Sequence, residues 1–161
     1  MNKKILKLLG EDARMKLRDI ADAAGLSEEQ AAAEIADMEK TGLIKGYKAV
    51  IDWDRLQDDA YVSAVIELTV TPKPGRGFEY VAEKVMKYPE VESVYLMSGS
   101  YDLNVVVRAR TFQEVALFVA KELSLIDSVT STSTHFVLRR YKDMNVELLG
   151  SGDDDRGNYL L

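Results

Sequence analysis

Residues 98–102, Ser98-Gly99-Ser100-Tyr101-Asp102, combine residue types that could hold a small zwitterion. Gly99 would let the backbone approach a ligand closely. The N–H groups of an exposed loop could hold a carboxylate, and Asp102 could pair with an ammonium group. The same residues are also ordinary turn formers, so a plain hairpin loop is the alternative interpretation.

A second polar stretch, residues 130–135, carries five hydroxyl side chains followed by the only histidine of the chain. Strand alternation would place Thr130, Thr132 and Thr134 on one face, where their hydroxyls could line a polar pocket. Threonine is equally typical of a half-exposed strand without a binding role. His135 has no partner evident in the sequence, so we expect it to be an interface or surface residue and not a catalytic base.

The residue inventory excludes several chemistries. The chain has 161 residues, no cysteine and one histidine, which excludes thiol catalysis, Cys- or His-clustered metal sites and His-based triads. No apolar run is long enough to cross a bilayer and no signal peptide is evident, so we expect a cytoplasmic protein without a membrane partner. We predict no catalytic residue, no metal and no cofactor, and therefore a protein that works by binding.

The first 42 residues have helical periodicity. Apolar stripes that begin at Ile5 and Leu17 predict two helices, the first ended by Gly10 and the second by Gly25, which tolerates positive φ. Ser27 can cap a third helix by accepting the backbone N–H of residue 29 or 30. A helix, a tight glycine-containing turn and a capped helix are typical of a helix-turn-helix.

The third helix would present an acidic outer face if Ala31, Ile35 and Met38 face inward. That outer face would include Glu29 and Glu34. Carboxylates oppose DNA binding, because affinity comes largely from neutralising phosphates. The net charge of −6 nevertheless falls beyond residue 50, since residues 1–50 carry nine Lys or Arg and nine Asp or Glu.

The spacing of the apolar residues changes after residue 44 and is no longer helical. Residues 44–52 look like an extended linking strand and residues 53–59 like a polar hinge. Residues 60–142 then predict strands over 62–70, 91–97, 103–109 and 129–141. Two helices separate them, one with Phe78, Val81, Ala82, Val85 and Met86 inward, the other with Phe112, Val115, Ala116, Val119 and Leu123 inward. This β-α-β-β-α-β order is the ferredoxin-like arrangement.

The predicted fold class is therefore α+β, with two domains and two further segments. Residues 1–44 are expected to be the helix-turn-helix domain and residues 45–59 the linking strand and hinge. Residues 60–142 are expected to be the ferredoxin-like domain, and residues 143–161 an acidic C-terminal tail.

Several stretches, in this order, resemble the Lrp/AsnC family of feast/famine transcriptional regulators. They are Leu26-Ser27 at the third helix, the exit from Thr41 to Tyr47, the Gly99-Ser100-Tyr101-Asp102 loop, and Thr132, Thr134 and Lys142 near the last strand. The resemblance covers residues 1 to about 142. It implies a winged-helix-like DNA-binding domain followed by a ferredoxin-like (RAM-type) domain for ligand sensing and dimerisation.

The resemblance also implies partners. The expected effector is an amino acid or a related small metabolite, held between sensing domains by residues beside the loop: Ser98, Gly99, Ser100, Tyr101, Asp102, Thr132 and Thr134. The expected assembly is a homodimer formed by packing of sheets, which could build tetramers or octamers.

The residues that would contact DNA under this resemblance are Lys16, Arg18, Ser27, Glu29, Gln30, Ala33, Glu34 and Lys45. Family members usually carry Arg or Lys at several exposed positions of the third helix, and position 34 is a frequent family arginine. Three interpretations stay open. Flanking basic residues bind DNA, or a more basic paralogue supplies the contacts in a mixed assembly. Alternatively, the helix-turn-helix is only a structural or protein-binding element of a ligand-sensing oligomer.

Overall fold

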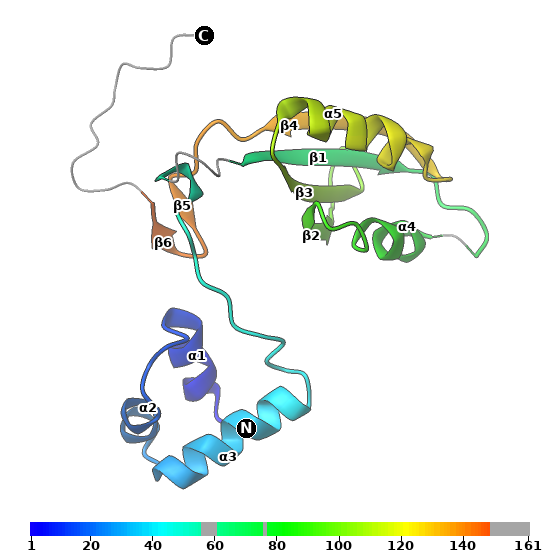
Figure 1. The fold of residues 1–161 in the computed structure, drawn as a ribbon. Coiled ribbons are helices and arrows are strands. Elements are labelled where there is room, and N and C mark those ends of the chain that lie inside the picture. Colours follow the sequence, from blue (N-terminus) through cyan, green and yellow to red (C-terminus); the bar gives the residue numbers. More distant parts are fainter. Residues whose placement is uncertain (56–60, 76, 149–161) are drawn as a thin grey trace. The chain divides into compact units, whose positions relative to one another are not determined.

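The computed structural model describes residues 1–55, 61–75 and 77–148. They belong to two units, Met1–Val50 and Ile51–Leu161 (Figure 1). Each unit has a hydrophobic core of its own. Residues 56–60 of the predicted hinge and residues 149–161 of the predicted acidic tail lie outside the described residues.

The N-terminal unit consists of three helices, α1 (Lys3–Glu11), α2 (Leu17–Ala24) and α3 (Glu28–Lys40). Their inward faces meet in a core of fully buried side chains: Ile5, Ile20, Ala21, Ala31 and Met38. Ile35 is half-buried and packs against this core. The predicted inward face of the third helix is therefore confirmed.

Two glycines near the ends of α1 and α2 behave differently. Gly25 has a φ of 70° and ends α2 in the left-handed region, as predicted. Gly10 does not end α1, because the helix continues through it to Glu11 and stops where Asp12 becomes extended. A helix tolerates one interior glycine at a cost of about 1 kcal/mol, so that prediction was wrong.

The segment after α3 is not the strand that we expected. Among the described residues, no strand includes residues 44–52, and a short 3₁₀ turn, η1 (Trp53–Arg55), follows. An extended segment becomes a strand only when another strand pairs with its backbone groups. Ile44, just after α3, packs on the helical core, whereas Leu43 is 50% exposed.

The C-terminal unit confirms the predicted ferredoxin-like order. In chain order its main elements are β1 (Val62–Val70), α4 (Phe78–Val85), β2 (Val91–Leu96), β3 (Leu103–Ala109), α5 (Phe112–Lys121), η2 (Leu123–Leu125) and β4 (Val129–Phe136). The strands form one antiparallel sheet in the order β2-β3-β1-β4. A small hairpin of β5 (Lys142–Asp143) and β6 (Val146–Glu147) follows, where the sequence predicted a longer last strand and then a tail.

Both helices of this unit pack on the same face of the sheet. Side chains from α4 and α5 share one core with the alternating buried residues of β1 and β3, such as Ile66 and Val105. The opposite face carries half-buried Val65 and Val106, which are cross-strand partners. In the described structure, no helix of this unit covers that face.

Three predicted inward side chains of the helices prove to be exposed. Met86 caps the end of α4 and is 60% exposed, because the helix stops one residue earlier than its apolar pattern. Phe112 and Ala116 of α5 are also exposed, and Phe118, which we did not predict, is buried instead. The Phe112 ring packs edge-to-face against the Phe136 ring of β4, with centroids 4.8 Å apart.

Candidate ligand-sensing and DNA-binding sites

The loop of residues 98–102 joins β2 to β3 and lies beside the end of β1. The Met97 N–H donates to the Asp102 carbonyl at 2.8 Å and closes the hairpin. The Asp102 N–H donates to the Leu68 carbonyl of β1 at 3.0 Å. These two backbone bonds hold the base of the loop against the sheet.

The Asp102 side chain completes this attachment. One of its carboxylate oxygens, Oδ2, accepts the backbone N–H of Val70 at 2.7 Å. The ladder between β1 and β3 ends at the pair of Leu68 with Leu103, so Val70 has no partner on β3. The carboxylate therefore takes the place of a missing ladder partner, and its second oxygen remains for another donor.

The rest of the loop is more open. Ser98, Gly99 and Ser100 are exposed, and a Cβ built at Gly99 meets no other atom within 4 Å. Tyr101 is half-buried, and its hydroxyl accepts a hydrogen bond from the Asn104 amide at 3.2 Å. The exposed backbone is free to be approached closely by a ligand, while Tyr101 and Asp102 form its fixed base.

The predicted threonines lie on the edge strand β4. Thr132 pairs with Leu68 and Thr134 pairs with Ile66, so both point to the face that carries the helices, and both are half-buried. Leu68 pairs with Leu103 on its other side, which places Thr132 and the loop at the same end of the sheet. They are about 10 Å apart, since β1 lies between them.

Thr130 and His135 have partners of their own within the sheet. The Thr130 hydroxyl donates to the Thr69 carbonyl at 3.1 Å. The His135 ring nitrogen lies 3.2 Å from the Ser133 hydroxyl and 3.6 Å from a carboxylate oxygen of Glu67. His135 is exposed on the face opposite the helices, consistent with a surface or interface position.

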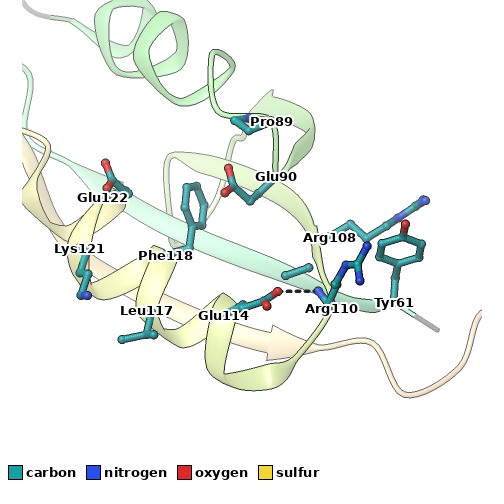
Figure 2. A pocket seen from close by; sticks show the side chains of 11 residues that line it. Tyr61, Pro89, Glu90, Arg108, Arg110, Glu114, Leu117, Phe118, Lys121 and Glu122 are labelled. Atoms are coloured by element: carbon teal, nitrogen blue, oxygen red, sulfur yellow. Dashed lines mark hydrogen bonds between the residues drawn. The ribbon is translucent and has the colours of Figure 1, made fainter. Parts of the chain in front are cut away.

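A pocket of about 570 Å³ lies at the other end of the sheet, and no sequence pattern indicates it (Figure 2). It lies where β1 begins, at Tyr61, and where β3 ends, at Arg108 to Arg110. The chain after α4, at Pro89 and Glu90, and one face of α5 complete it. Its residues come from separate elements and form no motif, which explains why pattern analysis missed them.

The start of α3 shows the capping that the sequence predicted. The Ser27 hydroxyl accepts the backbone N–H of Gln30 at 3.2 Å, and the Gln30 side-chain oxygen accepts the N–H of Ser27 at 3.0 Å. This reciprocal pair is a capping box. It engages the Gln30 oxygen within the helix and leaves only its NH₂ group free to contact a base.

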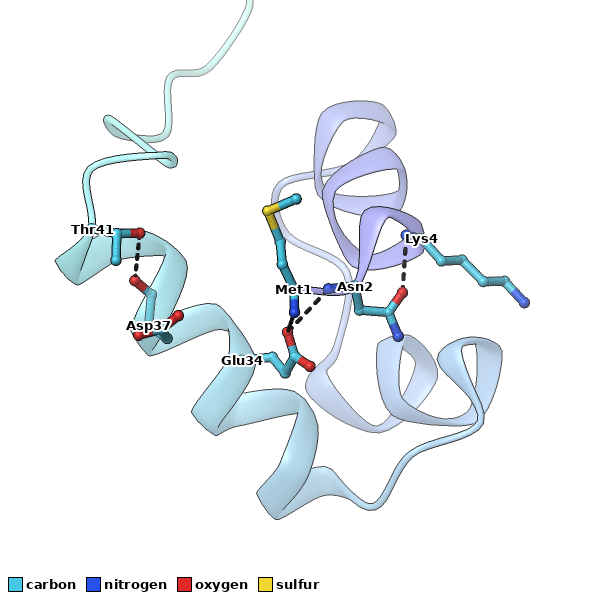
Figure 3. A network of polar contacts seen from close by, with 6 residues as sticks. All are labelled: Met1, Asn2, Lys4, Glu34, Asp37 and Thr41. Atoms are coloured by element: carbon cyan, nitrogen blue, oxygen red, sulfur yellow. Dashed lines mark hydrogen bonds and ion pairs between the residues drawn. The ribbon is translucent and has the colours of Figure 1, made fainter.

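Glu34 does not lie on the open outer face of α3. It is half-buried, and its carboxylate lies 3.3 Å from the α-ammonium of Met1 and accepts the N–H of Asn2 at 3.0 Å (Figure 3). The prediction that this carboxylate lies on the open outer face of the helix was therefore wrong. Its charge is compensated by the chain terminus, which lowers the repulsion that it would exert on a phosphate.

The remaining predicted DNA contacts are exposed. Glu29 and Ala33 project from α3, Lys16 precedes α2, and Lys45 follows α3. Arg18 is exposed on α2, and its guanidinium lies 3.9 Å from an oxygen of Asp22, one turn away. Such an exposed helical pair is weak, so Arg18 can exchange Asp22 for another anion.

Tyr47 connects the segment of residues 41–47, which follows α3, to the helix itself. Its hydroxyl donates to a carboxylate oxygen of Glu39 at 2.8 Å. Burial raises the pKa of Tyr47 above its ordinary value of 10.0, and the hydrogen bond and negative charge of Glu39 raise it further. The tyrosine that follows the helix-turn-helix therefore has a structural role in holding residues 41–47.

Two kinds of feature are absent from the described residues. No helix within the described ranges is long and apolar enough to span a membrane. No group of three or more His, Cys, Asp or Glu side chains in this part of the chain is placed to hold a metal ion.

Both halves of the chain match known domain families. An AsnC-type helix-turn-helix domain matches residues 1–39, and the Lrp/AsnC ligand binding domain matches residues 63–147. The uncharacterized HTH-type transcriptional regulator YugG of Bacillus subtilis is 45% identical over 152 residues, which cover 94% of this chain and 91% of that protein. The HTH-type transcriptional regulator FL11 of Pyrococcus horikoshii is 32% identical over 143 residues, covering 89% and 91%.

A solved structure shares the fold. The transcriptional regulator from Neisseria meningitidis in complex with L-methionine superposes with a TM-score of 0.70. The match covers 88% of this chain and 90% of that chain, at 24% sequence identity.

Proposed function

This chain belongs to the Lrp/AsnC family of transcriptional regulators, and we propose that it regulates transcription by binding DNA through its N-terminal unit and a small effector through its C-terminal unit. One observation carries the proposal. Two structurally separate units match, in order, a DNA-binding and a ligand-binding domain of the same family. The related proteins are transcriptional regulators and not enzymes.

DNA binding would use the exposed start of α3 together with the basic residues around it. The candidate contacts are Lys16, Arg18, Ser27, Glu29, Gln30, Ala33, Glu34 and Lys45. In a helix-turn-helix the second helix of the motif enters the major groove with its N-terminal residues nearest the bases. The internal pairing of Glu34 removes part of the electrostatic objection to this role. The alternative, in which α3 no longer contacts DNA, is not favoured.

The effector would bind at the loop end of the sheet, beside Ser98 to Asp102 and the hydroxyls of Thr132 and Thr134. Exposed loop backbone could receive a carboxylate, and the second oxygen of Asp102 could receive an ammonium group. An amino acid fits both requirements. The Neisseria protein solved with L-methionine supports this class of effector.

The assembly would be a homodimer formed by packing of the uncovered sheet faces, from which tetramers or octamers could be built. The sheet face opposite the helices supports this assembly, because it carries the apolar side chains of Val65, Val106 and Tyr95. Tyr95 is 55% exposed, which is high for a large side chain of this kind. An effector that prefers one arrangement of dimers would shift the spacing of the helix-turn-helix units along DNA. Light scattering of Val106→Lys should report smaller particles than the wild type, and unchanged mass would exclude this face.

The DNA-binding part is tested by fluorescence anisotropy with a fragment of the protein's own promoter at low and moderate salt. We expect binding that weakens steeply with salt, with a log–log slope of about −0.9 per neutralised phosphate. Arg18→Ala should reduce that slope by about 1, while Lys87→Ala, an exposed lysine of the other unit, should not change it. Absence of binding at low salt, with and without amino acids, would exclude an autonomous DNA-binding regulator.

The effector part is tested by thermal shift across the standard amino acids, because a ligand of the native state raises the melting temperature. Gly99→Val should remove the shift, since a side chain there blocks close approach without meeting other atoms of the chain. Gly46→Val is the matched control, because a Cβ at Gly46 also meets nothing within 4 Å. No shift in the wild type, or an equal shift in Gly99→Val, would contradict the proposed site.

A further inference from the structure

We propose that Trp53, packed against Arg108, is an anchor that shortens the tether between the two units and so restricts the half-site spacings that a dimer accepts on DNA. A half-site is the DNA segment bound by one N-terminal unit. The inference rests on the proposed function, in which the N-terminal units bind DNA and the C-terminal units form the dimer. It adds the residues that set the spacing specificity of such a regulator.

The anchor consists of two aromatic rings around one guanidinium group. The guanidinium carbon of Arg108 lies 5.0 Å from the ring centroid of Trp53 and 5.4 Å from that of Tyr61. The two rings contact each other edge-to-face, with centroids 5.6 Å apart. Figure 2 shows the side chains of Arg108 and Tyr61 side by side. Because aromatic rings attract a guanidinium group, and tryptophan does so best, Trp53 is held to the sheet although it precedes β1 in the chain.

Arg108 is itself fixed by the sheet. It belongs to β3, where it pairs with Ser63 of β1, and its backbone N–H donates to the Glu90 carbonyl at 2.8 Å. Its guanidinium group forms an ion pair with Glu92 of β2, and its side chain is only 21% exposed. Three strands therefore hold the cation in the position where the ring of Trp53 meets it.

A second anchor lies on the other side of the unit boundary. Tyr47 donates its hydroxyl hydrogen bond to Glu39 of α3 at 2.8 Å, which holds the chain to the N-terminal unit up to this residue. Only residues 48–52 lie between Tyr47 and Trp53, and the boundary between the units falls among them. No helix or strand includes these residues. We call residues 48–52 the tether.

The anchor at Trp53 decides the reach of the tether. An extended chain spans at most about 3.3–3.6 Å per residue, so Tyr47 and Trp53 can separate by at most about 20 Å. If Trp53 were released, the limit would be set by Val62, where β1 begins, and would rise to about 50 Å. The difference of about 30 Å is close to one helical turn of DNA, the distance by which half-sites are usually separated.

The short tether also affects affinity for a correctly spaced pair of half-sites. Once one N-terminal unit is bound, the second binds at an effective concentration that falls roughly as the −3/2 power of tether length. A tether between two and three times as long would lower that concentration about fourfold. The anchor thus favours one spacing strongly and disfavours the others.

The test is fluorescence anisotropy of the full chain with duplexes that carry two copies of one half-site from the promoter fragment. Their separation is varied one base pair at a time over about two helical turns. The wild type should prefer a narrow range of spacings. Trp53→Ala should lower the ratio of affinities at the best and worst spacings at least about threefold, with unchanged affinity for a single half-site. Trp53→Phe keeps an aromatic face on Arg108 and should restore most of the ratio.

Three further variants complete the experiment. Insertion of about nine Gly and Ser residues between Val50 and Ile51 lengthens the tether directly and should reproduce the effect of Trp53→Ala. Tyr141→Ala removes a ring that lies 5.7 Å from Arg139 in the same unit, and it should keep the wild-type profile. Arg108→Gln should broaden the profile and shift the emission of Trp53, the only tryptophan of the chain, to longer wavelengths.

Each result has a defined meaning. A wild-type profile in both Trp53→Ala and Arg108→Gln, beside a broadened profile for the insertion, would overturn the anchor and leave the proposed function intact. A wild-type profile for the insertion as well would show that tether length does not set the spacing, which also overturns the inference. A wild type that binds no half-site would contradict the proposed function itself. Trp53 belongs to neither hydrophobic core, so Trp53→Ala should fold, and Arg108→Gln keeps the test decisive if it does not.

Discussion

The carboxylate of Asp102 accepts the backbone N–H of Val70 at 2.7 Å, just beyond the last pair of the β1–β3 ladder, Leu68 with Leu103. Sequence pattern alone indicates a ligand contact for this aspartate, whereas the structure shows it holding the loop of residues 98–102 to β1. The two roles are compatible, because only one carboxylate oxygen is used. Asp102 would then fix the loop in position before a ligand arrives, which lowers the ordering cost of binding.

Asp102→Ala should lower the free energy of unfolding by about 1–3 kcal/mol, since it leaves the N–H of Val70, a residue only 5% exposed, without an acceptor. Asp102→Asn should cost less, because an amide oxygen can still accept this hydrogen bond. Urea denaturation measures both. Glu83→Ala serves as the surface control and should stay within about 0.5 kcal/mol of the wild type. Equal effects of Asp102→Ala and the control would contradict the structural role.

Glu34→Ala should destabilise the N-terminal unit by up to about 1 kcal/mol, because the carboxylate and the Met1 ammonium are both partly exposed. The difference from the wild type should shrink as salt is added, since salt screens such a pair. Asp37→Ala removes an exposed carboxylate on the same helix and should have no comparable salt-dependent effect. Thermal unfolding at two salt concentrations measures this difference. Identical salt responses of Glu34→Ala and the wild type would show that the Glu34 pair does not contribute to stability.

Ser27→Ala should lower stability by about 1 kcal/mol, because the N–H of Gln30 at the start of α3 loses its acceptor. Ser27→Gly should cost only a few tenths of that amount, as glycine is tolerated at this position. Loss of helical circular dichroism in urea gives the comparison, with exposed Ser124→Ala as control. A neutral Ser27→Ala would mean that the capping box does not hold the helix start in solution.

Alkaline pH should destabilise the fold through Tyr47 and Tyr88. Burial raises the pKa of both phenols, with further increases from hydrogen bonds to Glu39 and Glu122 respectively. A folded-state pKa above the unfolded value of 10.0 means that the stability is fully present below pH 10 and is lost as the pH rises through the higher folded pKa.

Unfolding measured on both sides of pH 10 checks this expectation. The double variant Tyr47→Phe and Tyr88→Phe should show a shallower alkaline loss than the wild type, since neither position can then ionise. Tyr95→Phe, whose tyrosine is exposed on β2, is the matched control. A wild type and a double variant with the same alkaline profile would refute the coupling.

Much of the architecture followed from signals within a few residues of one another. Gly25 ends α2 because it can adopt positive φ, and Ser27 starts α3 because its hydroxyl reaches the N–H of a residue three positions on. The period-two spacing of Ile66, Leu68 and Val70 predicted the strand over residues 62–70, and all three side chains are buried. These are local geometric requirements, so the sequence alone determined the elements, their order and the family resemblance.

Only the tertiary structure decided which side chains meet. The helical pattern of α3 places Glu34 on the outer face, but in the structure its carboxylate pairs with the ammonium group of Met1. Glu90 lines a pocket although no sequence motif surrounds it. The segment 44–52 has a strand-like composition, but composition does not supply a pairing partner. Such contacts join residues tens of positions apart, and their free energy depends on packing and desolvation at a distance, for which one-dimensional periodicity carries no information.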